Sequence, residues 1–435
     1  MTPTEATELM LRYLEGDADA GEVARLQEAL AASPELVAVC ADVSRQHLQL
    51  RELAEESRMK FRVLDGGKRF IRPAWIATAA AAAIALAAFI FLRPEKAAGV
   101  GAEVVSSENA GAAWLKGTRL LLSKLDIKSG TVRLRLDNGA LVMLTAPVAA
   151  EFISPLRVKV RHGQITADVH GGGKGFVVEA NGTEVVDLGT EFGVKVSERG
   201  DTDVVVFEGE VQLQKTKTPG AKPWLNLNGG EGVSLDAASN PTRIQAVYGD
   251  PSESWTLASS TDSQTLVHAV SDNIDIPGFN EFYRIRPGAL KAGMSPYSSP
   301  SVWREPPGTS FPSELLGADV ITTLPGKRFN PTFAMTVALN RPATMYVFHD
   351  TRRPPPNWLK RDFSKTAMSL QLIKLPDALS AEVKQSIPRD AQGEMYLTFS
   401  VWKHDVPAGN VVLGESLRSA ERIPHFMYGV AVKAR

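Results

Sequence analysis

Residues 176–196, FVVEANGTEVVDLGTEFGVKV, decide the fold class of the central part of the chain. Asn181-Gly182 is a turn signal, and beyond it Phe192, Val194 and Val196 alternate with other residues. An alternation with a period of two predicts a β-strand that buries one face, and an Asn-Gly pair favours a tight turn. This stretch therefore predicts short strands joined by turns.

The same pattern extends over residues 113–236. Apolar residues alternate with arginines from Val132 to Leu136, and Asp137-Asn138-Gly139 follows as a hairpin signal. Val204 to Phe207 is a continuous apolar run, which is typical of a strand buried on both faces. Many short strands with turns at this spacing predict an all-β domain, either a β-sandwich or a short β-solenoid.

The composition limits the chemistry of the chain. Its 435 residues are 44% hydrophobic and 22% charged, with a formal net charge of −1, so apolar material suffices for folded cores and no basic field favours direct nucleic-acid binding. Cys40 is the single cysteine, which excludes an intramolecular disulfide and a zinc site built on several thiolates. No cluster of His, Asp and Glu suggests a metal site, and we expect no cofactor.

The first 92 residues predict two further parts. Residues 74–92, AWIATAAAAAIALAAFIFL, carry no charge, and at about 1.5 Å per residue they would cross the ~30 Å hydrocarbon core of a membrane as one helix. Six basic residues precede this segment between Arg58 and Arg72, which by the positive-inside rule places the N-terminus in the cytoplasm. Residues 1–66 carry apolar residues at helical spacing and predict a small all-α domain.

The composition changes again after residue 236. Residues 237–280 are rich in Ser, Asp and Thr and predict a linker. In residues 281–435, apolar runs separated by Pro and Gly turns predict a second β-sandwich. We expect its aromatic residues in the core, except for Trp358, which follows three prolines in a predicted loop and is a candidate ligand contact.

Two His-Asp pairs in this last part, His349-Asp350 and His404-Asp405, raise the question of catalysis. Neither pair has a third residue that would complete a catalytic triad, and the sequence has no G-x-S-x-G motif. We therefore expect no catalytic residues and a protein that is not an enzyme.

Five segments in order resemble the FecR protein domain from end to end: LRLDNGALVML, VKVRHGQITADV, the stretch quoted first, VVVFEGEVQL and NLNGGEGVSL. The form of the domain resembles versions in planctomycete-like bacteria, with an extra C-terminal β module. Because glycines at turns and valines in strands specify a fold rather than chemistry, we interpret the most diagnostic matches as structural. These are Val186, Leu188, Gly189, Thr190, Phe192, Val194, Phe207, Glu208, Gly209 and Val211.

A second resemblance lies near the N-terminus. Residues 11–36, LRYLEGDADAGEVARLQEALAASPEL, resemble the N-terminal helical domain of FecR-type anti-sigma regulators. In that family this domain holds an extracytoplasmic-function sigma factor. The resemblance implies that sigma-factor contacts are made by Leu11, Tyr13, Leu14, Leu26 and Leu30.

Together these patterns predict a multidomain protein. Its expected parts are a small all-α cytoplasmic domain (1–66), one transmembrane helix (74–92), an all-β extracytoplasmic FecR domain (113–236), a linker (237–280) and a C-terminal β-sandwich (281–435). We expect a single-pass protein of the bacterial inner membrane, in contact with membrane lipid, with its C-terminus in the periplasm.

The expected function is to sense an envelope signal and to regulate an extracytoplasmic-function sigma factor. The outer partner would be an envelope ligand or protein that the sequence does not identify. The alternative is a membrane-anchored envelope or glycan-binding protein without transcriptional output.

Overall fold

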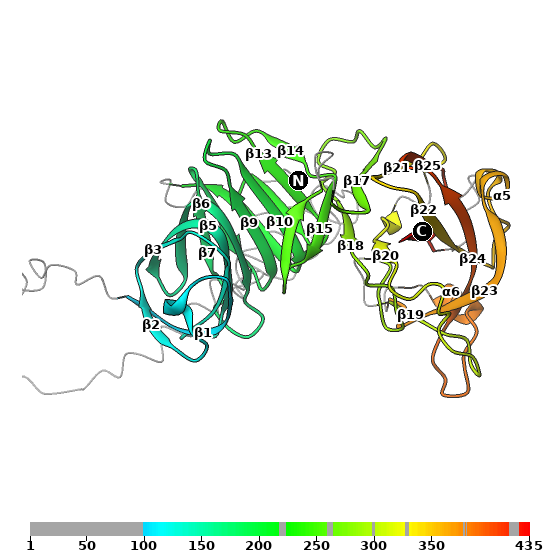
Figure 1. Cartoon of the computed structure of the whole chain (residues 1–435), viewed down its shortest axis with the longest axis horizontal. Helices are drawn as coiled ribbons and strands as arrows, with labels where there is room; N and C mark the ends of the chain where they lie inside the picture. The colour runs from blue at the N-terminus through cyan, green and yellow to red at the C-terminus, as the bar shows by residue number, and fades with distance from the viewer. Residues whose placement is uncertain are drawn as a thin grey trace, which may run out of the picture. The chain divides into compact units, whose positions relative to one another are not determined.

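The computed structural model describes most of the chain beyond residue 98. The described residues are 99–216, 223–258, 264–297, 301–326, 330–376, 379, 381–416 and 426–435 (Figure 1). They belong to one compact unit that spans Glu95–Arg435. Strands make up most of its regular structure.

A 14-stranded sheet contains the first half of the described strands. Neighbouring strands are antiparallel except for the parallel pair β6 and β7. A short 3₁₀-helix, Ala112–Trp114, follows β1. The strands are β1 Val100–Glu108, β2 Arg119–Leu122, β3 Lys124–Ile127, β4 Thr131–Leu136, β5 Leu141–Ser154, β6 Arg157–Asp168, β7 Val177–Ala180, β8 Thr183–Asp187, β9 Glu191–Val196, β10 Thr202–Glu208, β11 Glu210–Lys215, β12 Leu225–Asn228, β13 Gly232–Leu235 and β14 Pro241–Arg243.

This sheet branches at the long strand β6. Residues 157–160 of β6 pair with β7, whereas residues 163–168 pair with β9. One branch continues through β8, β11 and β12, and the other through β10, β13 and β14. Apolar side chains from both branches belong to one core, so the two branches pack around the same apolar interior.

Strand β10 shows how its sequence fits this position. Val204 and Val206 are fully buried in the core of the sheet. Val205 points to the other face, as the alternation of a strand requires, and is buried in a separate small core with Trp255 and Phe282. The prediction that this apolar run is a strand buried on both faces is therefore confirmed.

The second half of the described strands forms two sheets around one large core. The nine-stranded sheet has the order β16-β15-β18-β20-β26-β22-β24-β23-β19, and the three-stranded sheet has the order β17-β21-β25. The strands are β15 Ala246–Asp250, β16 Ser254–Leu257, β17 Val267–Asp272, β18 Tyr283–Arg286, β19 Val302–Arg304, β20 Asp319–Ile321, β21 Met335–Leu339, β22 Ala343–Asp350, β23 Ser364–Ile373, β24 Leu397–Val406, β25 Gly409–Leu413 and β26 Gly429–Ala434.

The predicted fold class needs correction. The described part is mostly β-strand, and it contains neither a small all-α domain nor a transmembrane helix. Its two α-helices, α5 Asn357–Asp362 and α6 Ala381–Ser386, have six residues each and so rise about 9 Å, against the ~30 Å of a hydrocarbon core. No helix in the described ranges is both long enough and apolar enough to span a membrane. Residues 1–66 and 74–92, on which those elements were expected, lie outside the described residues.

Residues 237–280, for which the sequence predicts a linker, carry regular structure. They contain β14, β15, β16 and β17. β15 lies in the nine-stranded sheet, where it pairs in parallel with β18. This segment therefore builds part of the folded unit and brings Trp255 to the 14-stranded sheet.

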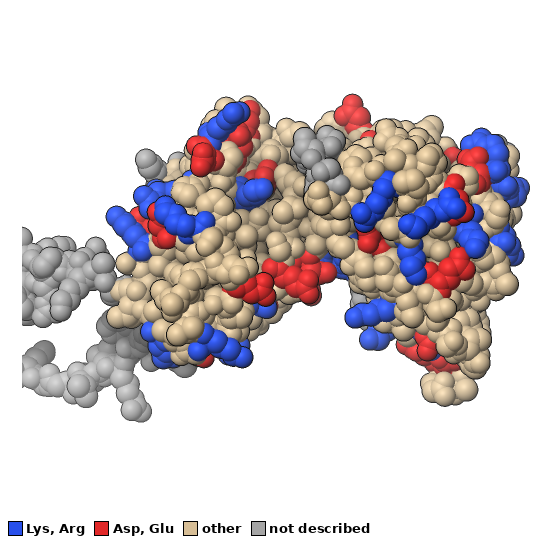
Figure 2. Space-filling model, viewed as in Figure 1, with Lys and Arg blue, Asp and Glu red and all other residues tan. Residues whose placement is uncertain are grey.

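Charged side chains of both signs are spread over the visible face of the described part (Figure 2). In the 14-stranded sheet, two ion pairs link side chains of strands β6, β7 and β8. Lys159 Nζ on β6 lies 2.9 Å from Glu179 Oε1 on the adjacent β7, and Arg157 Nη1 on β6 lies 2.8 Å from Glu184 Oε1 on β8, one strand further along. Such cross-strand pairs of opposite charge support the observed register.

Candidate functional site

The turn between β8 and β9 holds several residues that carry the family resemblance. Asp187 is fully buried, and its carboxylate accepts hydrogen bonds from the backbone N–H groups of Gly175 and Gly189 and from the Thr190 hydroxyl. Gly209 packs against this turn, where a Cβ would lie 2.5 Å from the Gly189 carbonyl oxygen. These contacts hold the turn in place and expose no reactive group.

The other residues of the resemblance are divided between the core and the surface. Phe192, Val194 and Val211 are buried, Val186 and Phe207 are half-buried, and Leu188 and Glu208 are exposed. The structure does not gather them into one site. Their described contacts are those of a folded sheet.

Trp255 of β16 docks on the 14-stranded sheet. Its indole Nε1 donates to the Thr166 hydroxyl at 2.9 Å, and its carbonyl oxygen accepts from Gln164 Nε2 at 3.0 Å. Its ring covers Gly193, where an added Cβ would lie 2.5 Å from the ring carbons. The sheet has room for this indole because residue 193 has no side chain.

Phe207 extends this contact on the same face. Its ring meets the rings of Trp255 and Phe282 edge-on, with centroid distances of 6.0 and 6.3 Å. The guanidinium of Arg284 lies over the Phe207 ring, 5.1 Å from its centroid. The 14-stranded sheet and the segment from β15 to β18 therefore share a buried aromatic contact.

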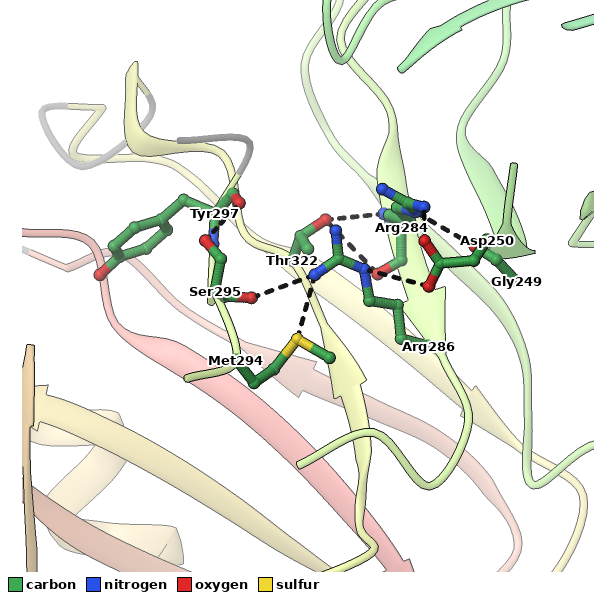
Figure 3. Close-up of polar contacts among 8 residues, drawn as sticks. All are labelled: Gly249, Asp250, Arg284, Arg286, Met294, Ser295, Tyr297 and Thr322. Atoms are coloured by element: carbon green, nitrogen blue, oxygen red, sulfur yellow. Dashed lines mark hydrogen bonds and ion pairs between the residues drawn. The ribbon is translucent and has the colours of Figure 1, made fainter. Parts of the chain in front are cut away.

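Strand β18 places two arginines on one face. Tyr283 and Ile285 are buried, and Arg284 and Arg286 alternate with them, so the two guanidinium groups lie on the same side of the strand (Figure 3). Arg284 donates through Nε to the Gly249 carbonyl at 3.1 Å and through Nη2 to the Asp250 carboxylate.

Arg286 has weaker partners than Arg284. Its Nη1 donates to Met294 Sδ at 3.1 Å and to the Ser295 carbonyl at 3.4 Å (Figure 3). Its Nε lies 3.8 Å from Asp250 Oδ2 and makes no hydrogen bond with the described residues. One carboxylate, Asp250, thus stands between two guanidinium groups.

The electrostatics of this group follow from burial. Burial and the neighbouring charge of Arg286 lower the pKa of Arg284 to about 10, and burial lowers the pKa of Arg286. Arg284 therefore stays protonated at neutral pH. Burial and the neighbouring Asp168 raise the pKa of Glu191 on β9, against the opposing effect of Arg284. Guanidinium groups in such a setting favour carboxylate and phosphate oxygens.

Trp358, the candidate ligand contact, lies in α5 and is only 8% exposed. Its indole Nε1 donates to the Glu415 carbonyl at 2.9 Å, and its ring packs edge-on against Phe363 and Tyr428. An exposed loop ring was expected, whereas the helix after the prolines turns this ring into the core. It offers a ligand no open stacking face in this structure.

The remaining predicted sites are not assembled in the described part. The residues with an expected sigma-factor contact (Leu11, Tyr13, Leu14, Leu26 and Leu30) lie outside the described residues. Asp350 pairs with Arg352, and Asp405 accepts from the Thr344 hydroxyl. In the described ranges, no group of three or more His, Cys, Asp and Glu could hold a metal ion.

The arginine pair was missed in the sequence, although a signal for it exists. In Tyr283-Arg284-Ile285-Arg286 the strand alternation places both cations on one face. Nothing local indicates that Asp250 on β15 is their shared partner, because that contact depends on the pairing of β15 with β18.

Comparison with known proteins identifies one domain. Residues 123–212 match the FecR protein family, and this part of the chain is a FecR domain. No curated protein matches the chain.

Solved structures resemble the chain more loosely. Two of them are structures of a protein described as a "putative anti-sigma factor" from Parabacteroides distasonis ATCC 8503, and they are 22% and 23% identical to this chain. Each match covers 28% of this chain, covers 58% or 59% of the solved chain, and has a TM-score of 0.24. A β-glucuronidase from glycoside hydrolase family 2 shares 12% identity over 80% of this chain and 40% of its own, with a TM-score of 0.29. The chain spans less than two-thirds of each of these structures, and similarity this loose supports no functional argument.

Proposed function

We propose that this chain regulates an extracytoplasmic-function sigma factor in response to a signal received by its β-rich part. The observation that carries the proposal is the FecR domain at residues 123–212. The resemblance implies a role in sensing across the bacterial envelope, with a sigma factor as the cytoplasmic partner.

The junction around Trp255 supports a route from the C-terminal part to the FecR domain. Trp255 is buried between them and is held by Thr166 and Gln164 of β6. A ligand regulates a protein only if it binds two states of that protein with different affinity. A buried contact that both parts share allows a ligand bound in the C-terminal part to favour one state of the FecR domain.

Co-purification tests the proposed partner. The full chain is co-expressed with each extracytoplasmic-function sigma factor of the source organism, and a stoichiometric complex is expected with one of them. Leu26→Glu, in the segment that resembles the sigma-binding domain, should abolish the complex. The matched control is Leu115→Glu at a leucine that is 64% exposed in the β-rich part, and it should leave the complex intact. If none of the sigma factors forms a complex with the chain, the proposal is contradicted.

We also propose that residues 99–435 act outside the cytoplasm. This range contains no cysteine, as suits a compartment where free thiols oxidise. The absence of cysteine also provides the test. Val412 of β25 is 59% exposed, so Val412→Cys in a Cys40→Ala background presents one accessible thiol. A membrane-impermeant maleimide should label it in intact spheroplasts as fully as in lysed ones. Labelling only after lysis would place this part in the cytoplasm.

A further inference from the structure

Most buried arginines of the C-terminal part have a carboxylate within hydrogen-bond distance. Arg243, Arg304 and Arg352 each donate to an aspartate or glutamate at 2.6 to 3.0 Å. This is the arrangement that a buried guanidinium requires, since an unpaired buried charge is strongly unfavourable. Arg286 departs from this arrangement, and so does Arg353, whose Nε and Nη2 are buried without a hydrogen-bond partner among the described residues.

The donors of Arg286 are poorly satisfied. Its side chain is only 15% exposed, yet its acceptors are a thioether sulfur and a carbonyl oxygen at 3.4 Å, both on Nη1. Nε is buried without a hydrogen-bond partner, and Nη2 makes none with the described residues. Nε and Nη2 form one edge of the guanidinium, the edge that carboxylate and phosphate groups bind with two parallel hydrogen bonds.

The charges around this edge are also unbalanced. The Asp250 carboxylate accepts a hydrogen bond from Arg284 Nη2, whereas its Oδ2 lies 3.8 Å from Arg286 Nε. Glu191, which faces Arg284 from β9, has a raised pKa because of burial and of Asp168. Two guanidinium groups therefore share the single carboxylate of Asp250. The Asp250 side chain is 42% exposed, so the group is open to solvent on that side.

We propose that Arg286, together with Arg284, binds the oxyanion group of a small ligand, either a carboxylate or a phosphate. The oxyanion takes the place of Asp250 beside Arg286 and accepts hydrogen bonds from Nη2 and from Nε, which is buried without a hydrogen-bond partner among the described residues. The site lies beside Phe207 of the FecR domain, on which Arg284 stacks. The inference goes beyond sigma-factor control and does not depend on it, because binding is measured on the purified chain.

Inorganic phosphate and acetate are the two probes, each titrated against the full chain at an ionic strength held constant with sodium chloride. Bound anion stabilises the folded state by mass action, so we expect a saturable rise in Tm, with calorimetry giving a Kd in the millimolar range. If only phosphate gives a saturable rise in Tm, the ligand carries a phosphoryl group. If only acetate does, the ligand carries a carboxylate. If both do, the site accepts either group. Saturation by neither would overturn the proposal.

Substitutions locate the binding at Arg286. Arg286→Gln should abolish the saturable response, and Arg286→Lys, which keeps the charge but loses the planar edge, should weaken it. The matched control is Arg135→Gln on β4, which removes the same charge at an exposed position and should bind as the wild type does. Equal binding by Arg286→Gln and the wild type would overturn the proposal.

Asp250→Asn decides the question even if Arg286→Gln does not fold. Removing the resident carboxylate leaves both guanidinium groups without their shared anion, so anion affinity should rise by about tenfold. An affinity equal to or below that of the wild type would show that the anion does not bind beside these guanidinium groups, and that result would overturn the proposal.

Discussion

Neighbouring residues of β18 belong to two clusters of charged side chains. The clusters differ in how many of their hydrogen-bond donors have an acceptor. On one face, the Tyr283 hydroxyl donates to Asp272 Oδ2 at 2.8 Å, and Arg243 forms a bidentate pair with the same carboxylate at 2.8 Å for both bonds. On the other face, Arg284 and Arg286 share Asp250. The first cluster is closed, because its charges match and its donors are used.

The two carboxylates also differ in the exposed fraction of their side chains. The side chain of Asp272 is 0% exposed, against 42% for Asp250. A buried, fully bonded carboxylate fixes the positions of the strands around it, whereas a half-exposed carboxylate beside an unsatisfied guanidinium leaves room for a ligand. We therefore assign stability to the Asp272 cluster and binding to the Asp250 cluster.

Asp272→Asn should have the largest effect on stability. It leaves the Arg243 guanidinium buried without its counter-charge, which costs about 3–5 kcal/mol in the free energy of unfolding. Urea denaturation of the full chain at pH 7 measures the change. A loss below about 1 kcal/mol would show that Arg243 finds another partner, and the closed cluster would then not be structural.

Gly193→Ala should have the next largest effect, because a Cβ there would lie 2.5 Å from the ring of Trp255. Overpacking of this kind costs about 1–3 kcal/mol and should shift the tryptophan fluorescence. In a Trp255→Ala background the same substitution should cost almost nothing, because the clash is gone. Gly171→Ala is the matched control, since its Cβ would meet its nearest atom at 3.6 Å. Equal costs in both backgrounds would refute the contact.

Lowering the pH should weaken the closed cluster. Burial raises the pKa of Asp272, but hydrogen bonds from Arg243, the Ile274 backbone and Tyr283 outweigh it and hold the pKa below its usual value. The stabilisation is therefore present above the unfolded pKa of about 3.9 and is lost as the pH falls through the folded pKa. Urea midpoints between pH 7 and pH 3 should fall more steeply for the wild type than for Asp272→Asn. Parallel profiles would contradict this assignment.

Asp250→Asn should have the smallest effect on stability. Because the Asp250 side chain is more than one-third exposed, solvent partly screens its ion pairs, and we expect a smaller loss than for Asp272→Asn. The same urea measurement as for Asp272→Asn provides the comparison. A loss as large as that of Asp272→Asn would place both clusters in the structural class.

Local patterns of the sequence predicted local structure well. The Asn181-Gly182 turn joins β7 and β8, with positive φ angles of 40° and 81° at its two residues. The Asp137-Asn138-Gly139 signal joins β4 and β5 as an antiparallel pair. Such features are set within a few residues, so alternation and turn chemistry suffice to predict them.

Features that depend on distant contacts were not predicted. Trp255 is buried by Gln164 and Thr166, which lie 91 and 89 positions away in the chain. Trp358 is buried because Glu415 and Tyr428 pack against it. The sequence around either tryptophan is turn-rich and polar enough to suggest a loop, and only the tertiary fold shows that both rings are internal.

Transcript measurement in the source organism tests the central claim, that this FecR-domain chain regulates a sigma factor. Transcripts that depend on the co-purifying sigma factor are compared among wild-type cells, cells lacking the chain, and deleted cells supplied with the chain or with its Leu26→Glu variant. We expect a severalfold change in these transcripts on deletion, which the intact chain reverses and the Leu26→Glu chain does not. Transcript levels that are the same in all four strains would contradict the account.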